Sequence, residues 1–373
     1  MAAPPTAEKR RPVTAGATAP SGAGRWLAGR TWTASPRAFQ VVALVAVWAL
    51  ALTIISGAAV RLTGSGLGCS TWPSCTQTSV VAPWRLHAWI EFGNRLINAA
   101  VTVAAVGALV VALRRRPRRR DLTWLSVGMV AGLLVEVVMG GLVVYSDLNP
   151  VLVSIHFLFG LAFLALAVVL HHRSGLPDGP PAGVMPAGEP QARVAPAGVM
   201  PAGGPQARVA LVRPWQIRLS RLMLVALTVV VALGTVVTST GPHGGDPRAP
   251  RFHFSLHSVA QLHGTSVEAF LALTLVMLWS LAHTGAPRPV IRRAQVMLVV
   301  LAAQAAVGYA QYLSGDPVAI VAVHVAGASL AVIAVLRFYF GLWTYGADPS
   351  TAAGGDPYGL ARPAPGPAAP AAG

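Results

Sequence analysis

The chain has 373 residues, of which 54% are hydrophobic and only 11% are charged. A soluble domain usually carries about a quarter charged residues, so the composition excludes an ordinary soluble protein and favours an integral membrane protein. The formal charge of +16 does not indicate a nucleic-acid partner, because the arginines flank apolar segments instead of forming a basic domain. The bias toward Gly, Pro, Ala and Arg, with Lys9 as the only lysine, suggests a GC-rich bacterial source.

The first 36 residues are rich in Ala, Pro, Gly and Arg and lack a short apolar core with a cleavage site. They are interpreted as a disordered cytoplasmic tail and not as a signal peptide.

Eight apolar segments follow, and about 20 apolar residues suffice for a helix to cross a bilayer. The predicted spans are 38–60, 89–113, 122–145, 151–172, 217–239, 257–282, 290–313 and 318–342. The predicted fold class is therefore all-α integral membrane, with eight transmembrane helices in two pseudo-symmetric four-helix bundles. The N-terminal half comprises residues 37–172 and the C-terminal half residues 214–342, and a disordered tail is expected over 343–373.

Residues 173–213 separate the halves and are interpreted as a disordered cytoplasmic linker. This segment contains a 15-residue duplication, PAGVMPAGEPQARVA at 181–195 and PAGVMPAGGPQARVA at 196–210. Its Pro and Gly content is typical of flexible linkers.

The two halves resemble each other in sequence. ISGAAVRLTGSG after the first span matches LGTVVTSTGPHG after the fifth, and IEFGNR aligns with VAQLHG. GGLVVYSDLNPVLVSIH matches VGYAQYLSGDPVAIVAVH with one residue of slippage. Because each half has an even number of helices, both halves share one orientation and an axis along the membrane normal should relate them.

Positive charge predicts the orientation. The N-terminal tail and the even-numbered loops are rich in arginine, including six between 114 and 120, whereas the odd-numbered loops are poor in it. The positive-inside rule then places both termini in the cytoplasm, and the chain is expected in the plasma membrane as a multi-pass protein.

Two histidines in the C-terminal half point to a cofactor. His263 and His324 are expected at equal depth in the sixth and eighth spans, toward the outer side. One histidine in a span is often only a hydrogen-bonding group facing the bundle interior. Two imidazoles that face each other across a bundle can hold haem iron, whereas zinc would want further ligands.

The N-terminal half repeats this pattern imperfectly. His156 corresponds to His324, but Asn94 stands where the other half has His263. Glu91 lies three residues before Asn94 on the same helical face, and an acidic residue at this depth is a functional candidate.

Neighbours of Glu91 leave alternatives open. Glu91 could merely pair with Arg95, four residues on. His87 lies one turn before Glu91 and is interpreted as a helix-end residue at the membrane interface.

The only cysteines, Cys69 and Cys75, lie in the first outer loop. Their short spacing permits a disulfide, and a place outside the membrane favours oxidation. The alternative is a dithiol that exchanges electrons. In the fifth loop, His243, Arg248 and Arg251 are candidates for contact with a haem propionate.

These motifs together resemble the haem A synthases, membrane enzymes related to the mitochondrial Cox15 proteins. The resemblance rests on RLTGSGLGCSTWPSC, IEFGNR, DLNPVLVSIH, GTVVTSTGPHGGD, QLHG and GYAQYLSGDPVAIVAVH, in this order and spacing. It covers roughly residues 40–340, and it is expected to be of the actinobacterial type.

The resemblance implies an oxidoreductase that converts the C8 methyl of haem O to a formyl group by successive hydroxylations, giving haem A for cytochrome oxidase. It implies haem b in the C-terminal half, bound by His263 and His324, and the substrate haem in the N-terminal half, with Glu91 catalytic and His156 as a ligand. It also matches the cysteine pair of bacterial members to Cys69 and Cys75.

The implied partners are haem O and an unidentified electron acceptor. Haem O synthase, cytochrome oxidase assembly factors and further copies of the chain are compatible with this function. Nucleic acid is not expected.

One departure matters. The family usually has histidine where this chain has Asn94, and an amide is a poor iron ligand. The substrate haem is therefore expected to use His156 alone or to recruit His87, with Asn94 and Arg95 beside it. The rival functions are a di-haem electron-transfer cytochrome, which predicts a histidine pair in both halves, and a membrane haem transporter, which predicts broken helices at mid-membrane.

Overall fold

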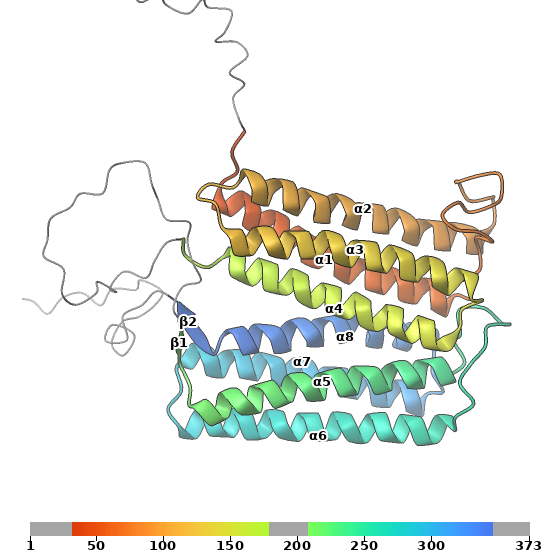
Figure 1. Cartoon of the computed structure of the whole chain (residues 1–373). Coiled ribbons are helices and arrows are strands. Elements are labelled where there is room, and N and C mark those ends of the chain that lie inside the picture. Colours follow the sequence, from red (N-terminus) through yellow and green to blue (C-terminus); the bar gives the residue numbers. More distant parts are fainter. Residues whose placement is uncertain (1–31, 179–207, 346–373) are drawn as a thin grey trace, which may run out of the picture. The chain divides into compact units, whose positions relative to one another are not determined.

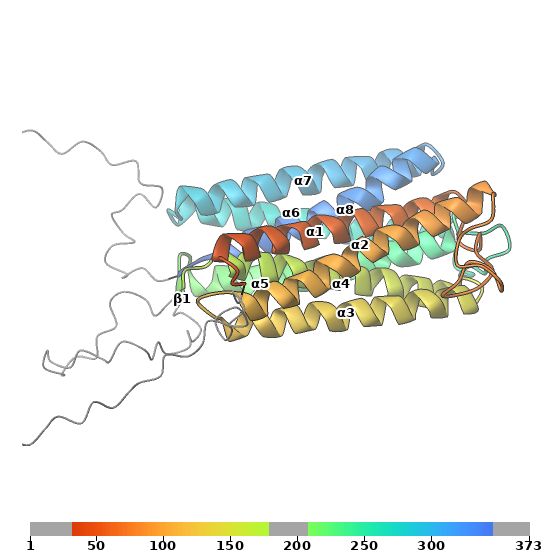
Figure 2. The same ribbon diagram turned by 90° about the horizontal axis from the view of Figure 1, so that it is seen from above.

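The computed structural model describes residues 32–178 and 208–345, and within these ranges it contains eight long helices (Figures 1 and 2). They are α1 (Pro36–Leu62), α2 (Leu86–Arg114), α3 (Arg120–Tyr145), α4 (Pro150–Ser174), α5 (Pro214–Thr240), α6 (Leu256–His283), α7 (Arg288–Leu313) and α8 (Val318–Phe340). Each is long and apolar enough to cross a bilayer. The chain is therefore an all-α, multi-pass membrane protein, which confirms the predicted fold class.

Most helices extend the predicted spans by up to three residues, because polar capping residues continue the helix past the apolar segment. Ser35 caps α1, with its side chain accepting a hydrogen bond from a first-turn N–H, and Pro36 takes the first helical position. Asn149 and Pro150 begin α4 in the same way. The exception is α8, which ends at Phe340, two residues before its predicted end.

The helices pack as two rings of four. Each of α1–α4 contacts the next, and α1 contacts α4; helices α5–α8 repeat this arrangement (Figure 1). Between the rings, α4 contacts α8, α1 contacts α8 and α4 contacts α5. Helix α1 corresponds to α5, and α4 corresponds to α8. The α1–α8 contact is therefore equivalent to the α5–α4 contact, as expected if a two-fold axis relates the halves.

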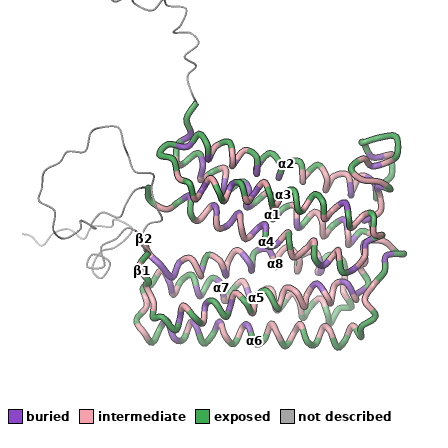
Figure 3. Tube along the Cα trace, in the orientation of Figure 1, coloured by how far each residue is buried: buried purple, intermediate pink, exposed green. Residues whose placement is uncertain are grey.

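Burial follows the helix contacts, as Figure 3 shows. Small residues such as Ala105 and Ala108 are fully buried, while large apolar side chains such as Trp48, Val103 and Val299 are more than half exposed. An apolar surface of this extent is unusual for a water-soluble monomer. It suits helices whose outer faces contact lipid.

The loops after α1, α3, α5 and α7 lie at one end of the helices, here termed the cysteine-loop end; the opposite end is termed the arginine end (Figures 1 and 2). At the cysteine-loop end the two halves are joined through backbone groups. The N–H of Gly66 donates to the carbonyl of Gly245 at 2.8 Å. Arg61, in the last turn of α1, donates to the carbonyls of His243 and Thr238 at 2.6 and 2.8 Å.

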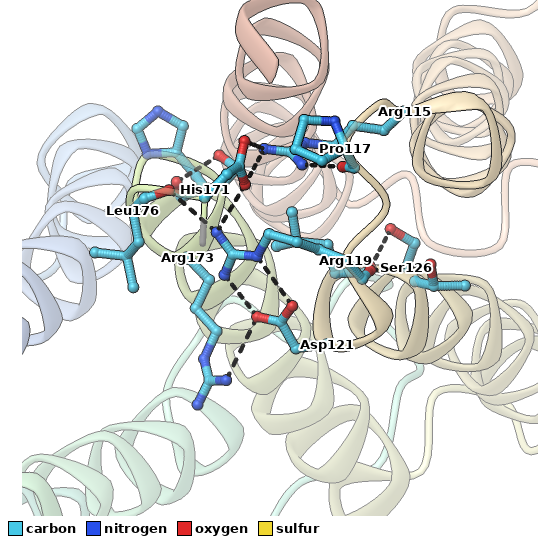
Figure 4. A network of polar contacts seen from close by, with 12 residues as sticks. Arg115, Pro117, Arg119, Asp121, Ser126, His171, Arg173 and Leu176 are labelled. Atoms are coloured by element: carbon cyan, nitrogen blue, oxygen red, sulfur yellow. Dashed lines mark hydrogen bonds and ion pairs between the residues drawn. The ribbon is translucent and has the colours of Figure 1, made fainter. Parts of the chain in front are cut away.

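At the arginine end, an ion-pair network joins α3 to the end of α4 (Figure 4). Arg115 is 1% exposed and binds both oxygens of Asp178, at 2.8 and 2.9 Å. Arg119 pairs with Asp121 at 2.8 Å and lies 3.7 Å from Asp178, and Arg173 lies 3.7 Å from Asp121. Arg115 and Arg119, which belong to the arginine-rich segment used to predict the orientation, thus also stabilise the loop between α2 and α3.

Two short strands correct the predicted linker and tail. β1 (Arg208–Ala210) pairs antiparallel with β2 (Trp343–Tyr345), with Val209 opposite Thr344. The sequence assigned both segments to disordered regions, because three residues are too few to show a strand period. Their pairing shortens the linker and the tail by a few residues, while the duplication up to residue 207 lies outside the described residues.

Candidate functional site

In the second half, His263 of α6 and His324 of α8 face each other. Their ring centroids are 6.4 Å apart and the ring planes are nearly perpendicular, at 83°. Two imidazoles that bind one metal ion at about 2 Å each have ring centres roughly 6 Å apart. The observed spacing therefore fits a single iron between the two rings.

Each of these rings is oriented through its Nδ1 atom. Nδ1 of His263 lies 3.1 Å from the carbonyl oxygen of Val230 on α5. Nδ1 of His324 lies 3.3 Å from the amide of Gln304 on α7, which also donates to the carbonyl of His324 at 2.7 Å. The carbonyl of Val230 accepts the Nδ1 proton of His263, which leaves Nε2 of that ring to bind a metal. His324 would present Nε2 in the same way once the amide oxygen of Gln304, in place of its nitrogen, faces Nδ1.

Two glycines make room for the rings. A Cβ atom at Gly234 of α5 would lie 3.1 Å from the ring of His263, and a Cβ at Gly308 of α7 would lie 2.9 Å from the ring of His324. A side chain at either position would have to push its histidine aside. The second half is thus shaped around the two imidazoles.

The equivalent positions of the first half hold Asn94 of α2 and His156 of α4. The facing glycines are repeated as Gly57 of α1 and Gly140 of α3, but a Cβ there would lie 4.0 Å from the nearest atom of Asn94 or His156. Oδ1 of Asn94 accepts a hydrogen bond from the hydroxyl of Ser56 at 2.7 Å. At these two positions the first half therefore offers one imidazole where the second offers two.

Sequence reasoning missed Glu136 of α3. Its Oε2 lies 3.1 Å from Nδ1 of His156, and the side chain is 18% exposed. The two groups are close but do not form a well-aligned hydrogen bond. Neither Nδ1 of His156 nor Oε1 of Glu136 has a hydrogen-bond partner among the described residues. A carboxylate in the middle of an apolar span is costly unless it has a partner or a function, and that signal could have identified Glu136.

Glu91 of α2 is buried and engaged on both oxygens. Oε2 accepts a hydrogen bond from the N–H of Cys69 at 2.7 Å, and Oε1 pairs with Arg95 at 2.6 Å. Arg95 also donates to the carbonyls of Thr71 and Ser74, at 3.1 and 3.0 Å. The pairing considered as an alternative for Glu91 is therefore present, and both side chains hold the cysteine loop, residues 63–85, on α2.

The cysteine loop also reaches α3. The indole of Trp72 packs over Gly141, where a Cβ would lie 3.1 Å away. The hydroxyl of Tyr145 donates to the carbonyl of Trp72 at 2.5 Å. Because Gly141 adjoins the glycine that faces His156, the loop lies close to the first-half site.

Cys69 and Cys75 form a disulfide in this loop and are both fully buried. The first of the two alternatives for the cysteines is therefore the one seen in this structure. His87 is exposed at the start of α2, and its Nδ1 lies 2.8 Å from the hydroxyl of Ser65. This placement agrees with a helix-end residue.

The three candidates in the α5–α6 loop have separate positions. Nε2 of His243 lies 2.8 Å from the carbonyl of Asp316 in the α7–α8 loop. The side chain of Arg248 is 95% exposed, 3.9 Å from Asp246. Arg251 lies in the same loop, and its side chain is next to Gly244. His243 therefore joins two loops of the second half.

Comparison with known proteins identifies the family of the chain. The family model COX15-CtaA, described as cytochrome oxidase assembly protein, matches residues 40–243, more than half of the chain. Proteins named heme A synthase from Geobacillus kaustophilus, Geobacillus thermodenitrificans and Symbiobacterium thermophilum are similar to it, at 28% identity over 127 residues, 31% over 130 and 28% over 135. The alignments cover 33–36% of this chain and 40–44% of each relative, so the chain matches less than half of their length. Given the extent of the family match, this chain belongs to the COX15-CtaA family of cytochrome oxidase assembly proteins.

Proposed function

We propose that the chain is a haem A synthase, an oxidoreductase that converts the C8 methyl of haem O to a formyl group by successive hydroxylations. The observation that carries the proposal is the inequality of two equivalent sites. One has histidines whose ring centroids are 6.4 Å apart, and the other has His156 and Asn94 at the equivalent positions. Membership of the family and similarity to proteins named heme A synthase support the same function.

The second half is proposed to hold haem b between His263 and His324. The residues fit this group, because the ring spacing suits one iron and the glycines Gly234 and Gly308 leave the rings their space. Haem held by these two histidines would supply one-electron transfer. The protein's part is to hold the rings through Val230 and Gln304.

The first half is proposed to bind the substrate, haem O, through His156. Asn94 accepts a hydrogen bond from Ser56 on α1, so His156 would be the one imidazole at these two positions to bind the iron. Glu91 is the proposed proton acceptor for the methyl oxidation. Its contacts with Cys69 and Arg95 would fix the carboxylate while the loop covers the site.

The orientation follows from charge. The six arginines between residues 114 and 120 lie at the arginine end, which we propose faces the cytoplasm. The disulfide loop would then face the outside of the plasma membrane, where oxidation is favoured. Haem O synthase, an electron acceptor and oxidase assembly factors are the partners this function requires or accommodates.

The rival functions fit less well. A di-haem electron-transfer cytochrome needs two ligand pairs, and Asn94 interrupts one of them. A transporter built on broken helices is disfavoured, because each of the eight spans in the described ranges is one uninterrupted helix.

The test is haem A production. The chain is expressed in a host that makes haem O and no haem A, and the membrane pigments are extracted and identified by mass spectrometry. We expect haem A with the intact chain and none with Glu91→Gln, while the low-spin spectrum of the second half persists and shows that the variant has folded. Bound haem without any haem A from the intact chain would favour the electron-transfer cytochrome.

A further inference from the structure

Glu136 and Gln304 occupy equivalent positions in the two halves. Glu136 precedes His156 by 20 residues, and Gln304 precedes His324 by the same number. Each lies on the third helix of its half and approaches Nδ1 of the histidine on the fourth helix, with a carboxylate oxygen of Glu136 at 3.1 Å and the amide nitrogen of Gln304 at 3.3 Å. The repeat therefore keeps the contact but changes its chemistry, from a carboxylate to a neutral amide.

Among the described residues, the carboxylate of Glu136 has His156 as its only partner in an ion pair. Its other oxygen, Oε1, is buried without a hydrogen-bond partner there. A Cβ at Gly160 would lie 3.8 Å from Oε2, so Gly160 of α4 lies beside the carboxylate.

A carboxylate and an amide act differently on a metal-bound imidazole. A histidine that binds a metal through Nε2 carries a proton on Nδ1 and donates it to a partner, which fixes the ring orientation. A carboxylate partner draws this proton toward itself and makes the ring a stronger electron donor to the metal. A neutral amide can accept the Nδ1 proton only through its oxygen, and it then orients the ring with less effect on electron donation to the metal.

We propose that Glu136 is the positioning residue of the first-half site, and that its carboxylate, by accepting the Nδ1 proton when His156 binds iron, makes His156 a stronger iron donor than it would be beside an amide. The inference rests on the proposed function, because it takes His156 to be the ligand of the haem in the first half. It assigns the tuning of the two reduction potentials to one pair of equivalent side chains. Glu136 would lower the potential of the first-half iron relative to the same site with an amide, since stronger donation and a nearby negative charge both stabilise the oxidised form.

The test exchanges the two residues. Glu136→Gln and Gln304→Glu are nearly isosteric, so each gives one half the partner of the other half. The variants and the intact chain are expressed with a haem O source and purified with their haems, and the reduction potentials are measured by spectroscopic titration. Glu136→Gln should raise the potential of the first-half haem by about 59 mV or more, which is a tenfold change in the one-electron equilibrium, and should leave the second-half haem unchanged.

Gln304→Glu is the matched control, and it should lower the potential of the bis-histidine haem while leaving the other one unchanged. Resonance Raman spectra of the reduced protein should show the iron–histidine vibration of the first half at lower frequency in Glu136→Gln. If folded Glu136→Gln kept the same reduction potentials and the same iron–histidine frequency, the proposal would be overturned, and Glu136 would have only a structural role. The proposed function fails separately, if the intact chain makes no haem A whatever its potentials are.

Discussion

The two halves of the protein share a scaffold and differ at the positions that would touch a cofactor. Both are rings of four helices, and both place a glycine against each of the two ligand positions. The second half has His263 and His324 with the amide of Gln304, whereas the first has Asn94 and His156 with the carboxylate of Glu136. The comparison teaches that one duplicated frame presents different side chains at equivalent positions, and under the proposed function these differences would help to separate an electron-transfer site from a substrate site.

The largest effect is expected at the paired histidines. His263→Ala or His324→Ala should abolish the low-spin haem absorption of the purified protein, because one imidazole cannot fill both axial positions. The absorption spectrum of the reduced protein measures this. Asn94→Ala, at the position equivalent to His263, is the control and should leave that signal in place; an unchanged spectrum in both histidine variants would refute the second-half site.

Adding a histidine to the first half should make its ligand positions equal to those of the second half. Asn94→His would place a second imidazole opposite His156, in the position that His263 has in the other half. We expect a second low-spin component in the electron paramagnetic resonance spectrum and loss of haem A formation, because the open axial position is filled. If haem A formation continued at the normal rate with both low-spin components present, an open position would not be needed.

The glycines offer a smaller test of the same comparison. Gly308→Ala places a Cβ 2.9 Å from the His324 ring, whereas Gly140→Ala places it 4.0 Å from His156. Forcing a methyl group into a packed site costs about 1–3 kcal/mol, so Gly308→Ala should lower the thermal stability and haem content. Gly140→Ala should be tolerated, and equal losses in both variants would mean that the two sites are equally tight.

The smallest effect is expected where the halves meet. Ser154 of α4 and Ser239 of α5 are buried and share a hydrogen bond of 3.0 Å. Ser154→Ala removes one such bond, worth about 0.5–1.5 kcal/mol. Thermal unfolding measures the loss of stability in Ser154→Ala, Ser239→Ala and the double variant. The double variant should lose less stability than the sum of the two single variants, since either change breaks the same bond. Additive losses of stability would mean that the bond contributes nothing.

Several features of the candidate site were readable from residue type and spacing. His263 and His324 were recognised because a histidine in an apolar span is rare, and two of them fell at matching depths in one half. Asn94 stood out because the internal repeat aligned it with His263. Glu136 broke the apolar pattern of α3 but was overlooked, because its partner His156 lies on another helix. The strand pairing of Arg208–Ala210 with Trp343–Tyr345 joins segments too far apart and too short for any local pattern to reveal.

The sequence by itself determined the eight spans and the repeat of two halves, because apolar length and self-similarity are local properties of the chain. Only the tertiary structure decided which face of each helix meets which neighbour. The helices are apolar on nearly all sides, so hydropathy leaves their rotation open, and packing at residues such as Gly234 and Gly308 sets it. That rotation brings Glu136 to His156, Gln304 to His324, and Glu91 to the backbone of the cysteine loop.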